Sequence, residues 1–313
     1  MDALMGLLDG PRAQAAFLLR SVLDSPWSIR IEDEAPLTVV AVVRGEAWLV
    51  CDHAAPRVLR PGGVAILRGP DHYTVADTPT RTPSIFIRPG QVSTTLDGEG
   101  ICEAMDLGQR TWGNSPVGQV QMLTGTYQSP SEVSRLLLGA LPPVIVLSGD
   151  DWNCPFLNLL GAEMARDAPG QELVLDRLLD LVLIEALRAW LARPDSAAPT
   201  WYRAQGDSVV GIALRLIHGD PAQHWTVASL AQSTGVSRAA MARRFTELVG
   251  IPPMAYLTEW RLALAADLLR EPEETIGSVA RKVGYGSAFA LSTAFKRIRG
   301  VSPHQHRTRL ATA

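Results

Sequence analysis

Three cysteines and two histidines in the first half of the chain are of the types that redox or metal chemistry uses. Cys51, Cys102 and Cys154 are widely spaced and form no CxxC pair, so neither a structural zinc site nor a disulfide framework is predicted. Each cysteine fits the role of a small buried apolar residue, and the alternative is a redox-sensing thiol at Cys102 or Cys154. His72, with Cys51 and His53, is a candidate lining of an effector pocket. A metal at His72 alone would lack the three or four ligands such sites need, so no cofactor is predicted.

A second set of candidates lies between residues 225 and 307, at outward positions of two predicted helices. Arg243 is the best candidate for a bidentate contact to guanine, and Arg238 is the second. Phe289 either contacts thymine methyl groups or packs inward. The predicted base-contacting set is Arg238, Ala239, Ala242 and Arg243 in one helix, and Ala288, Phe289, Ser292 and Thr293 in the other. The predicted phosphate contacts are Arg244, Arg261, Arg281, Lys282, Lys296 and Arg297, with a solvated surface charge as the alternative for each.

The elements that position these side chains are two helix-turn-helix units that repeat one another. Leu230-Ala231 matches Val279-Ala280 at an offset of 49, and Phe245 matches Phe295 at an offset of 50. The extra residue falls in the turn, where an insertion costs least. Thr226, Ser237, Thr275 and Ser287 are predicted helix N-caps, and Gly235 is predicted to adopt the left-handed conformation of a tight turn. The buried stripes are predicted at Met241, Phe245 and Leu248, and at Leu291, Phe295 and Ile298.

This stretch resembles the DNA-binding domain of AraC/XylS-family transcription regulators. The resemblance covers roughly the last hundred residues and includes VGYGSAFALSTAFKRIRGVSPHQHR, from Val283 to Arg307. It implies an all-α domain whose second helix in each unit enters a major groove of double-stranded DNA. A helix from Met254 to about Arg270, preceded by Pro252-Pro253, would join the two units.

The first half of the chain has the pattern of a β-rich domain. Residues 1–20 predict an amphipathic helix, and short strands separated by turns follow from Trp27 to about Tyr127. The segment LRPGGVAILRGPDHYTV, from Leu59 to Val75, resembles the second motif of cupins, in which a histidine points into the barrel; His72 occupies that place. The first cupin motif's histidines are absent, which favours a metal-free sensor barrel over the alternative of a cupin oxygenase or isomerase carrying a DNA-binding tail.

The predicted fold class is therefore α+β: a cupin-like β-barrel with flanking helices, followed by the all-α domain. The expected domains are a sensor and dimerisation domain (1–192), a linker rich in Pro, Ala and Ser (193–207) and a DNA-binding domain (208–313). A long helix from Gln171 to Ala192 carries a wide apolar stripe, which fits a homodimer interface or packing within one subunit.

Charge is divided in the same way as the predicted domains. The chain of 313 residues has 29 Lys+Arg and 32 Asp+Glu. From Gln205 onward 13 residues are basic and 8 acidic, a net charge of +5. The part before Gln205 therefore has 29−13 = 16 basic and 32−8 = 24 acidic residues, a net charge of −8. A basic module behind an acidic one fits DNA binding by the second module alone. With no apolar run of membrane-spanning length and no leader pattern, the expectation is a cytoplasmic regulator of transcription that responds to a small effector or a redox signal, with RNA polymerase as a further partner.

Overall fold

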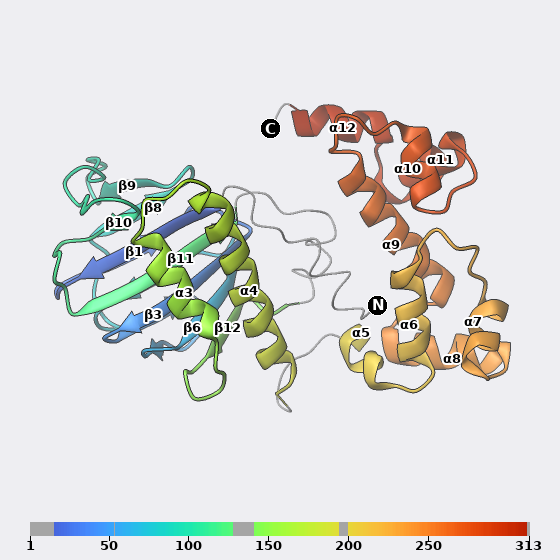
Figure 1. Ribbon diagram of the computed structural model, residues 1–313, viewed down its shortest axis with the longest axis horizontal. Coiled ribbons are helices and arrows are strands. Elements are labelled where there is room, and N and C mark those ends of the chain that lie inside the picture. Colours follow the sequence, from blue (N-terminus) through green and yellow to red (C-terminus); the bar gives the residue numbers. More distant parts are fainter. Residues whose placement is uncertain (1–15, 53, 128–140, 194–199, 312–313) are drawn as a thin grey trace. The chain divides into compact units, whose positions relative to one another are not determined.

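The computed structural model describes residues 16–52, 54–127, 141–193 and 200–311, which form a β-rich unit and a helical unit (Figure 1). The last described residue of the β-rich unit is Arg193, and the first described residue of the helical unit is Thr200. Mixed α+β architecture is confirmed.

Two six-stranded sheets build the β-rich unit. The first has the order β10-β1-β11-β3-β6-β12 and the second the order β5-β4-β7-β2-β8-β9. Neighbouring strands are antiparallel except for β1 with β10 and β2 with β8. The strands of the first sheet are β1 (Phe17–Leu23), β3 (Leu37–Arg44), β6 (Val64–Arg68), β10 (Thr111–Trp112), β11 (Val120–Tyr127) and β12 (Val144–Leu147). Those of the second are β2 (Ser28–Ile31), β4 (Ala47–Cys51), β5 (Arg57–Leu59), β7 (Tyr73–Ala76), β8 (Ile85–Arg88) and β9 (Val92–Thr95).

Two helices, α3 (Pro155–Met164) and α4 (Gln171–Leu191), cover the outer face of the first sheet (Figure 1). Strand β11 shows how close this packing is: a Cβ placed on Gly125 would lie 2.4 Å from the Leu179 side chain of α4. Next to it, the Tyr127 hydroxyl donates a hydrogen bond of 3.1 Å to Asp180 of the same helix. The inner face of β11 is thereby turned toward the second sheet.

Strand β1 corrects the expectation of a helix over residues 1–20, of which 1–15 lie outside the described residues. Phe17 and Leu19 face the space between the sheets, whereas Leu18 and Val22 are buried on the opposite face. Because both faces of β1 are covered, apolar residues occupy both faces, and only Arg20 and Ser21 interrupt the run. Such a run cannot be told from a helix by periodicity alone.

The helical unit contains the two predicted helix-turn-helix units. Its helices are α5 (Thr200–Arg203), α6 (Val210–Gly219), α7 (Val227–Thr234), α8 (Arg238–Val249), α9 (Pro253–Leu268), α10 (Ile276–Lys282), α11 (Ala288–Arg299) and α12 (Pro303–Ala311), with a 3₁₀ turn η1 (Ala204–Gly206). The four predicted N-caps are confirmed, because the hydroxyls of Thr226, Ser237, Thr275 and Ser287 each accept a hydrogen bond from the backbone N–H three residues on. Gly235 adopts the expected left-handed conformation, with φ of 69°.

Leu248, predicted to lie in the buried stripe of α8, is half-buried, and its neighbour Val249 is buried instead. Two further details differ from the sequence prediction. Ile298, predicted to be buried with Leu291 and Phe295, is 44% exposed, since the chain reverses at Gly300 and packs Val301 against that cluster instead. The second detail concerns the predicted linker, whose residues 200–206 are folded into α5 and η1. The hydroxyl of Thr200 donates a hydrogen bond of 3.3 Å to the Val249 carbonyl, which joins α5 to the end of α8.

Candidate nucleic-acid interface and barrel cavities

Helix α8 presents the first candidate base-reading face. Arg238, Ala239 and Arg243 are exposed and Ala242 is half-buried, while Met241 and Phe245 on the opposite face are fully buried. Arg243 is 3.6 Å from Glu247, its neighbour one turn on, and its side chain stays 74% exposed. An exposed pair of this kind holds a side chain only weakly, so Arg243 is free to reach a ligand.

Helix α11 presents the second face. Ala288 and Thr293 are exposed and Ser292 is half-buried. Phe289 points outward and is 81% exposed, which decides between the two orientations left open by the sequence. It is the one exposed aromatic ring among the described aromatic side chains of the helical unit. Burial of an aromatic ring is strongly favourable in water, so an outward ring at this position indicates a contact surface.

The six predicted phosphate contacts fall into two groups. Arg281, Lys296 and Arg297 are exposed and have no ion-pair partner in the described part of the chain. Lys282 forms an ion pair with Glu274. Arg244 is bound to Asp207 through two of its nitrogens, at 3.0 and 2.6 Å.

Asp207 is the reason why Arg244 is held in place. Its second carboxylate oxygen accepts the backbone N–H groups of Val209 and Val210 at 2.9 Å each, at the start of α6. Burial raises the pKa of Asp207, but the hydrogen bonds from Val210, Arg244 and Val209 together outweigh it, so the pKa lies below its usual value. Arg244 therefore connects α8 to α6 and supports the recognition helix from behind.

Arg261 has a structural position that its sequence context does not reveal. Its Nε donates to the Pro221 carbonyl at 2.7 Å, and one terminal nitrogen donates to the Gln223 carbonyl at 2.8 Å. The guanidinium lies 5.9 Å from the centre of the Tyr285 ring, and burial lowers its pKa. At Gly284, whose φ is +81°, an added Cβ would come within 2.7 Å of both Ala222 and Arg261.

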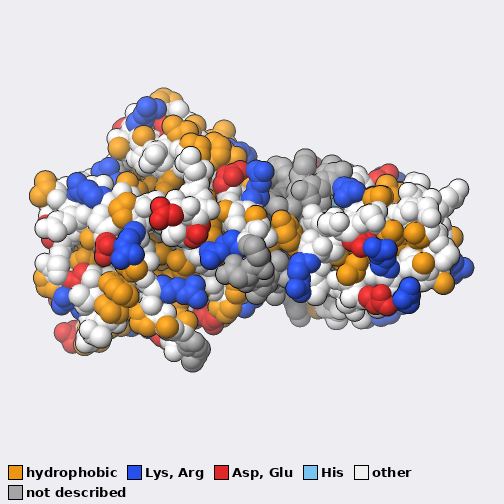
Figure 2. All heavy atoms as spheres, turned by 90° about the horizontal axis from the view of Figure 1, so that it is seen from below, with side chains coloured by type: hydrophobic (Ala, Val, Ile, Leu, Met, Phe, Trp, Pro, Cys, Tyr) orange, Lys and Arg blue, Asp and Glu red, His pale blue; other side chains and the backbone are white. Residues whose placement is uncertain are grey.

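We call this set, Arg261 with residues 221–223 and 284–285, the junction between the two helix-turn-helix units. It brings together helix α9, the loop before the first helix-turn-helix unit and the turn of the second one. Arg261 was predicted to contact phosphate; in the structure its Nε and one terminal nitrogen form these internal bonds. The basic residues of the helical unit do not form one continuous patch on the face that Figure 2 draws. There, basic side chains are set among acidic and apolar ones.

The predicted effector residues lie at the smaller of the two cavities that Tyr73 borders; a separate, more open hollow of about 620 Å³ is lined by polar residues such as Thr78 and Arg81. The smaller cavity, of about 310 Å³, is lined by Cys51, His72 and the charged residues Asp52, Arg57, Arg68 and Asp71. His53 lies outside the described residues. Burial raises the pKa of the Cys51 thiol. Among the described residues, no group of three or more His, Cys, Asp or Glu is arranged to hold a metal ion.

The larger cavity, of about 380 Å³, lies between the two sheets and was missed by the sequence prediction. Its wall is mainly apolar, with Leu19, Ile31 and Val40 among its members. Tyr73, which is 5% exposed, lines both cavities. The signal that could have found the larger cavity is the row of inward hydroxyl residues in otherwise apolar strands: Ser21 in β1, and Thr124 and Thr126 in β11.

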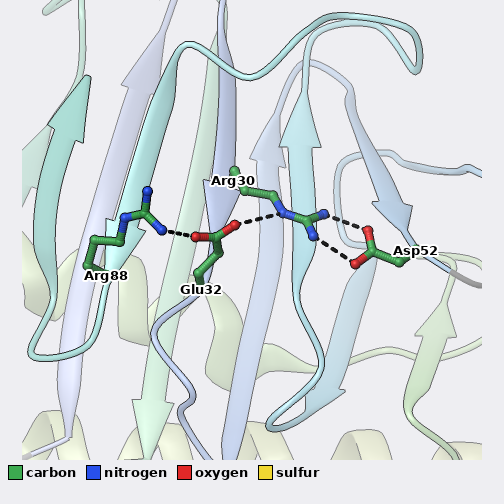
Figure 3. A network of polar contacts seen from close by, with 4 residues as sticks. All are labelled: Arg30, Glu32, Asp52 and Arg88. Carbon is green, nitrogen blue, oxygen red and sulfur yellow. Dashed lines mark hydrogen bonds and ion pairs between the residues drawn. The ribbon is translucent and has the colours of Figure 1, made fainter. Parts of the chain in front are cut away.

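An ion-pair network fixes the second sheet from outside (Figure 3). Arg30 of β2 donates two hydrogen bonds of 2.7 Å to Asp52, just beyond β4, and is 3.4 Å from Glu32. Glu32 in turn pairs with Arg88 at the end of β8. Because Ile29 and Ile31 alternate with Arg30 and line the larger cavity, the network holds one wall of the cavity without entering it.

The remaining thiols occupy different settings, and all three cysteines are free. Cys154 precedes α3 and is half-buried; burial raises its pKa, although the N–H groups of Leu157 and Phe156 oppose the effect. A raised pKa leaves little thiolate at neutral pH, which does not favour a fast redox response. Cys102 is exposed and lies on the lining of the larger cavity.

Comparison with known proteins agrees with this two-part organisation. A cupin family model matches residues 2–192, and a helix-turn-helix domain model matches residues 230–309. The chain is 32% identical to an AraC-like transcription regulator of Streptomyces lividans, over 98% of each chain. It is 27% identical to the HTH-type transcriptional regulator AlkR of Acinetobacter baylyi, over 98% of this chain and 99% of that one. Among solved structures, apo ToxT K231A of Vibrio cholerae covers 95% of this chain and 98% of its own, at 13% identity and a TM-score of 0.35. No described helix is long and apolar enough to cross a membrane.

Proposed function

The chain belongs to the AraC-like transcription regulators with a cupin domain, and we propose that occupancy of its barrel controls how its two helix-turn-helix units bind DNA. The proposal divides the chain into a sensor (1–192), a connecting segment (193–207) and a DNA-binding domain (208–313), in a protein of the cytoplasm. Its relatives are named as transcription regulators, which supports a regulator over the alternative of a cupin enzyme.

The observation that supports DNA reading most directly is the pair of exposed faces on α8 and α11. Both begin at a capped N-terminus; the first outward side chains are those of Arg238 and Ala239 in α8, and of Ala288 and Phe289 in α11. Helix α9 joins the two units, and its 16 residues span about 24 Å at 1.5 Å per residue. A rod of this length is compatible with recognition helices in successive major-groove segments, about 34 Å apart.

The two faces imply different kinds of contact. In α8, Arg243 has the donors for a bidentate bond to guanine. In α11, Phe289 offers apolar contact, such as to a thymine methyl group, while Ser292 and Thr293 offer single hydrogen bonds. Direct reading is therefore concentrated in the first unit, and part of the specificity must come from DNA shape.

The test is selection of binding sites with the full chain, followed by titration of Arg243→Ala. We expect the variant to lose about 1–3 kcal/mol of binding free energy on the selected site and to keep its affinity for random DNA. The matched control is Arg215→Ala, on the exposed side of α6. Equal losses on selected and random DNA would show that Arg243 contacts phosphate, and a loss by the control variant would show a general charge effect.

Dimerisation through α4 is the second part of the proposal. Three apolar side chains of α4 remain exposed in the single chain: Leu173 at 61%, Val174 at 45% and Leu181 at 37%. Val174, Leu178 and Leu181 follow one another at helical spacing and continue a stripe beyond the buried face. We expect Leu181→Glu to shift the full chain from dimer to monomer in analytical ultracentrifugation, whereas the same change at Leu96, which is 72% exposed and lies outside α4, is the control. A wild-type monomer would contradict this part alone.

A further inference from the structure

The larger cavity contains buried hydroxyl groups without a protein partner. Ser21, Ser93 and Thr126 line it at 4, 6 and 1% exposure. No hydrogen bond joins any of the three side-chain hydroxyls to another group within the described ranges, and each is open to the contents of the cavity. A hydroxyl that lines a cavity needs a hydrogen-bond partner from whatever fills the cavity, because leaving it unpaired costs free energy. These hydroxyls therefore point to a ligand with polar atoms.

The same cavity is lined by carboxylates that no cation neutralises. Asp33 is held by the Gln91 amide at 2.7 Å and by the Ala35 backbone N–H at 3.1 Å, and both bonds leave its charge in place. Glu103 and Asp106 lie on the lining too, and none of the three has an ion-pair partner in the part of the chain that is described. Burial raises the pKa of Tyr73, and the charge of Asp33 adds to this effect, which indicates that the Asp33 charge acts on the cavity wall.

One basic residue, Arg110, is on the lining described. One of its terminal nitrogens is 3.5 Å from Glu172, while its Nε is buried and has no hydrogen-bond partner among the described residues, so it can donate to a polar atom of a ligand. Arg30 and Arg88 are paired with Asp52 and Glu32 on the outer face of the sheet (Figure 3). The lining therefore combines an apolar wall with three carboxylates against one guanidinium; Asp33 is half-buried, whereas Glu103 and Asp106 are exposed to solvent.

From this combination, and on the premise that the barrel is the sensor, we propose that the effector is a small amphipathic cation: an aliphatic or aromatic body carrying a protonated amine. The body packs against Leu19, Ile31 and Val40, which are apolar and line the cavity. The amine donates to Asp33 and to the unpartnered hydroxyls, so that the buried charge acquires both a counter-charge and hydrogen bonds. An anion of the same shape would meet three carboxylates and could pair with Arg110 alone.

Three eight-carbon probes separate charge from shape: octylamine, octanol and octanoate. Each is titrated into the full chain at pH 7 in a calorimeter. We expect octylamine to bind more tightly than octanol, and octanoate to bind at least about tenfold more weakly than octylamine, since a charge-assisted bond contributes about 1.5–3 kcal/mol. Asp33→Asn keeps the shape of the side chain and should weaken octylamine about tenfold while leaving octanol nearly unchanged.

Two further variants complete the test. Glu103→Gln is at an exposed position, so its folding is not at risk, and it should weaken octylamine by a smaller factor. Asp71→Asn, on the lining of the smaller cavity, should leave all three probes unaffected. Equal affinity for the three probes, tighter binding of octanoate, or no binding of octylamine overturns the proposal.

Operator affinity, measured in the same mixtures, distinguishes this proposal from the proposed function. Octylamine that binds without changing operator affinity leaves the ligand class standing and refutes the sensor. Octanol or octanoate that changes operator affinity while octylamine fails to bind leaves the sensor standing and refutes the ligand class.

Discussion

Replacing Arg261 by methionine tests whether this residue contacts phosphate or holds the two helix-turn-helix units together. Methionine keeps much of the aliphatic length but removes both hydrogen bonds, to Pro221 at 2.7 Å and to Gln223 at 2.8 Å. A hydrogen bond to a charged group contributes about 1.5–3 kcal/mol, and both carbonyls lie in a loop where water can replace the donor. We therefore take the lower value for each bond and expect a loss of about 3 kcal/mol in the free energy of opening this junction.

Hydrogen–deuterium exchange of the full chain measures this loss locally. A change of about 3 kcal/mol corresponds to roughly a hundredfold faster exchange, and we expect it in the loop 221–223 and the turn around Gly284, with smaller changes in α8. Arg215→Met is the matched control, because Arg215 is exposed on α6 and has no ion pair among the residues described. Exchange in the β-rich unit should be the same in both variants.

The DNA readout separates the two roles of Arg261. The selected DNA site is compared with a variant site that has two base pairs inserted between the segments contacted by the two recognition helices. We expect the insertion to cost the wild-type chain about tenfold in affinity and the Arg261→Met variant less than about threefold, because a loosened junction lets the recognition helices adapt to another spacing. The structural role would be refuted by unchanged exchange together with uniform weakening on all DNA and a salt slope reduced by about 1, which is the behaviour of a lost phosphate contact.

Three further predictions concern single residues. Phe289→Ala should weaken binding to the selected site by about 1–2 kcal/mol without lowering thermal stability, since the ring is 81% exposed; a lower melting temperature would contradict its outward role. Asp207→Ala should destabilise α6 by about 1–2 kcal/mol. Because the pKa of Asp207 is lowered in the folded protein, its contribution to stability is present above the unfolded pKa near 3.8 and is lost as the pH falls through the lower folded pKa. The unfolding free energies of wild type and variant, measured between pH 2 and 7, should therefore converge only at the acid end. Cys154 should react with iodoacetamide more slowly at pH 8 than a free thiol, and mild oxidation should leave operator affinity unchanged; a reversible change abolished by Cys154→Ser would establish a redox sensor.

The helical unit was predictable because its signals are local. A cap such as Ser237 acts on a backbone N–H three residues on, and buried stripes such as Met241 and Phe245 follow from helical spacing. Ile298 fits the same spacing and still lies exposed, because its neighbourhood depends on how the chain turns after α11. The internal bonds of Arg261 were missed for a related reason: its partners are 38 to 40 positions away, and no local pattern identifies a backbone carbonyl as a partner.

In the β-rich unit the strands were predictable, but the site was not. Short runs bounded by turns indicated β3, β4, β6 and β11, whereas β1 has apolar residues on both faces, without strict alternation, and was predicted as part of a helix. The cupin-like motif directed attention to His72, which lies at the smaller cavity. The carboxylates of the larger cavity come from segments as far apart as Asp33 and Asp106, and only the folded sheets bring them together.

The shared position of Tyr73 has a thermodynamic consequence for the barrel. Its buried side chain belongs to the walls of both cavities, so an occupant of one cavity that displaces the ring reshapes the other. Two molecules bound on either side of the ring are then linked: whatever factor the first imposes on the affinity of the second, the second imposes on the first. A single aromatic side chain thereby gives the domain the means to combine two chemical inputs into one output.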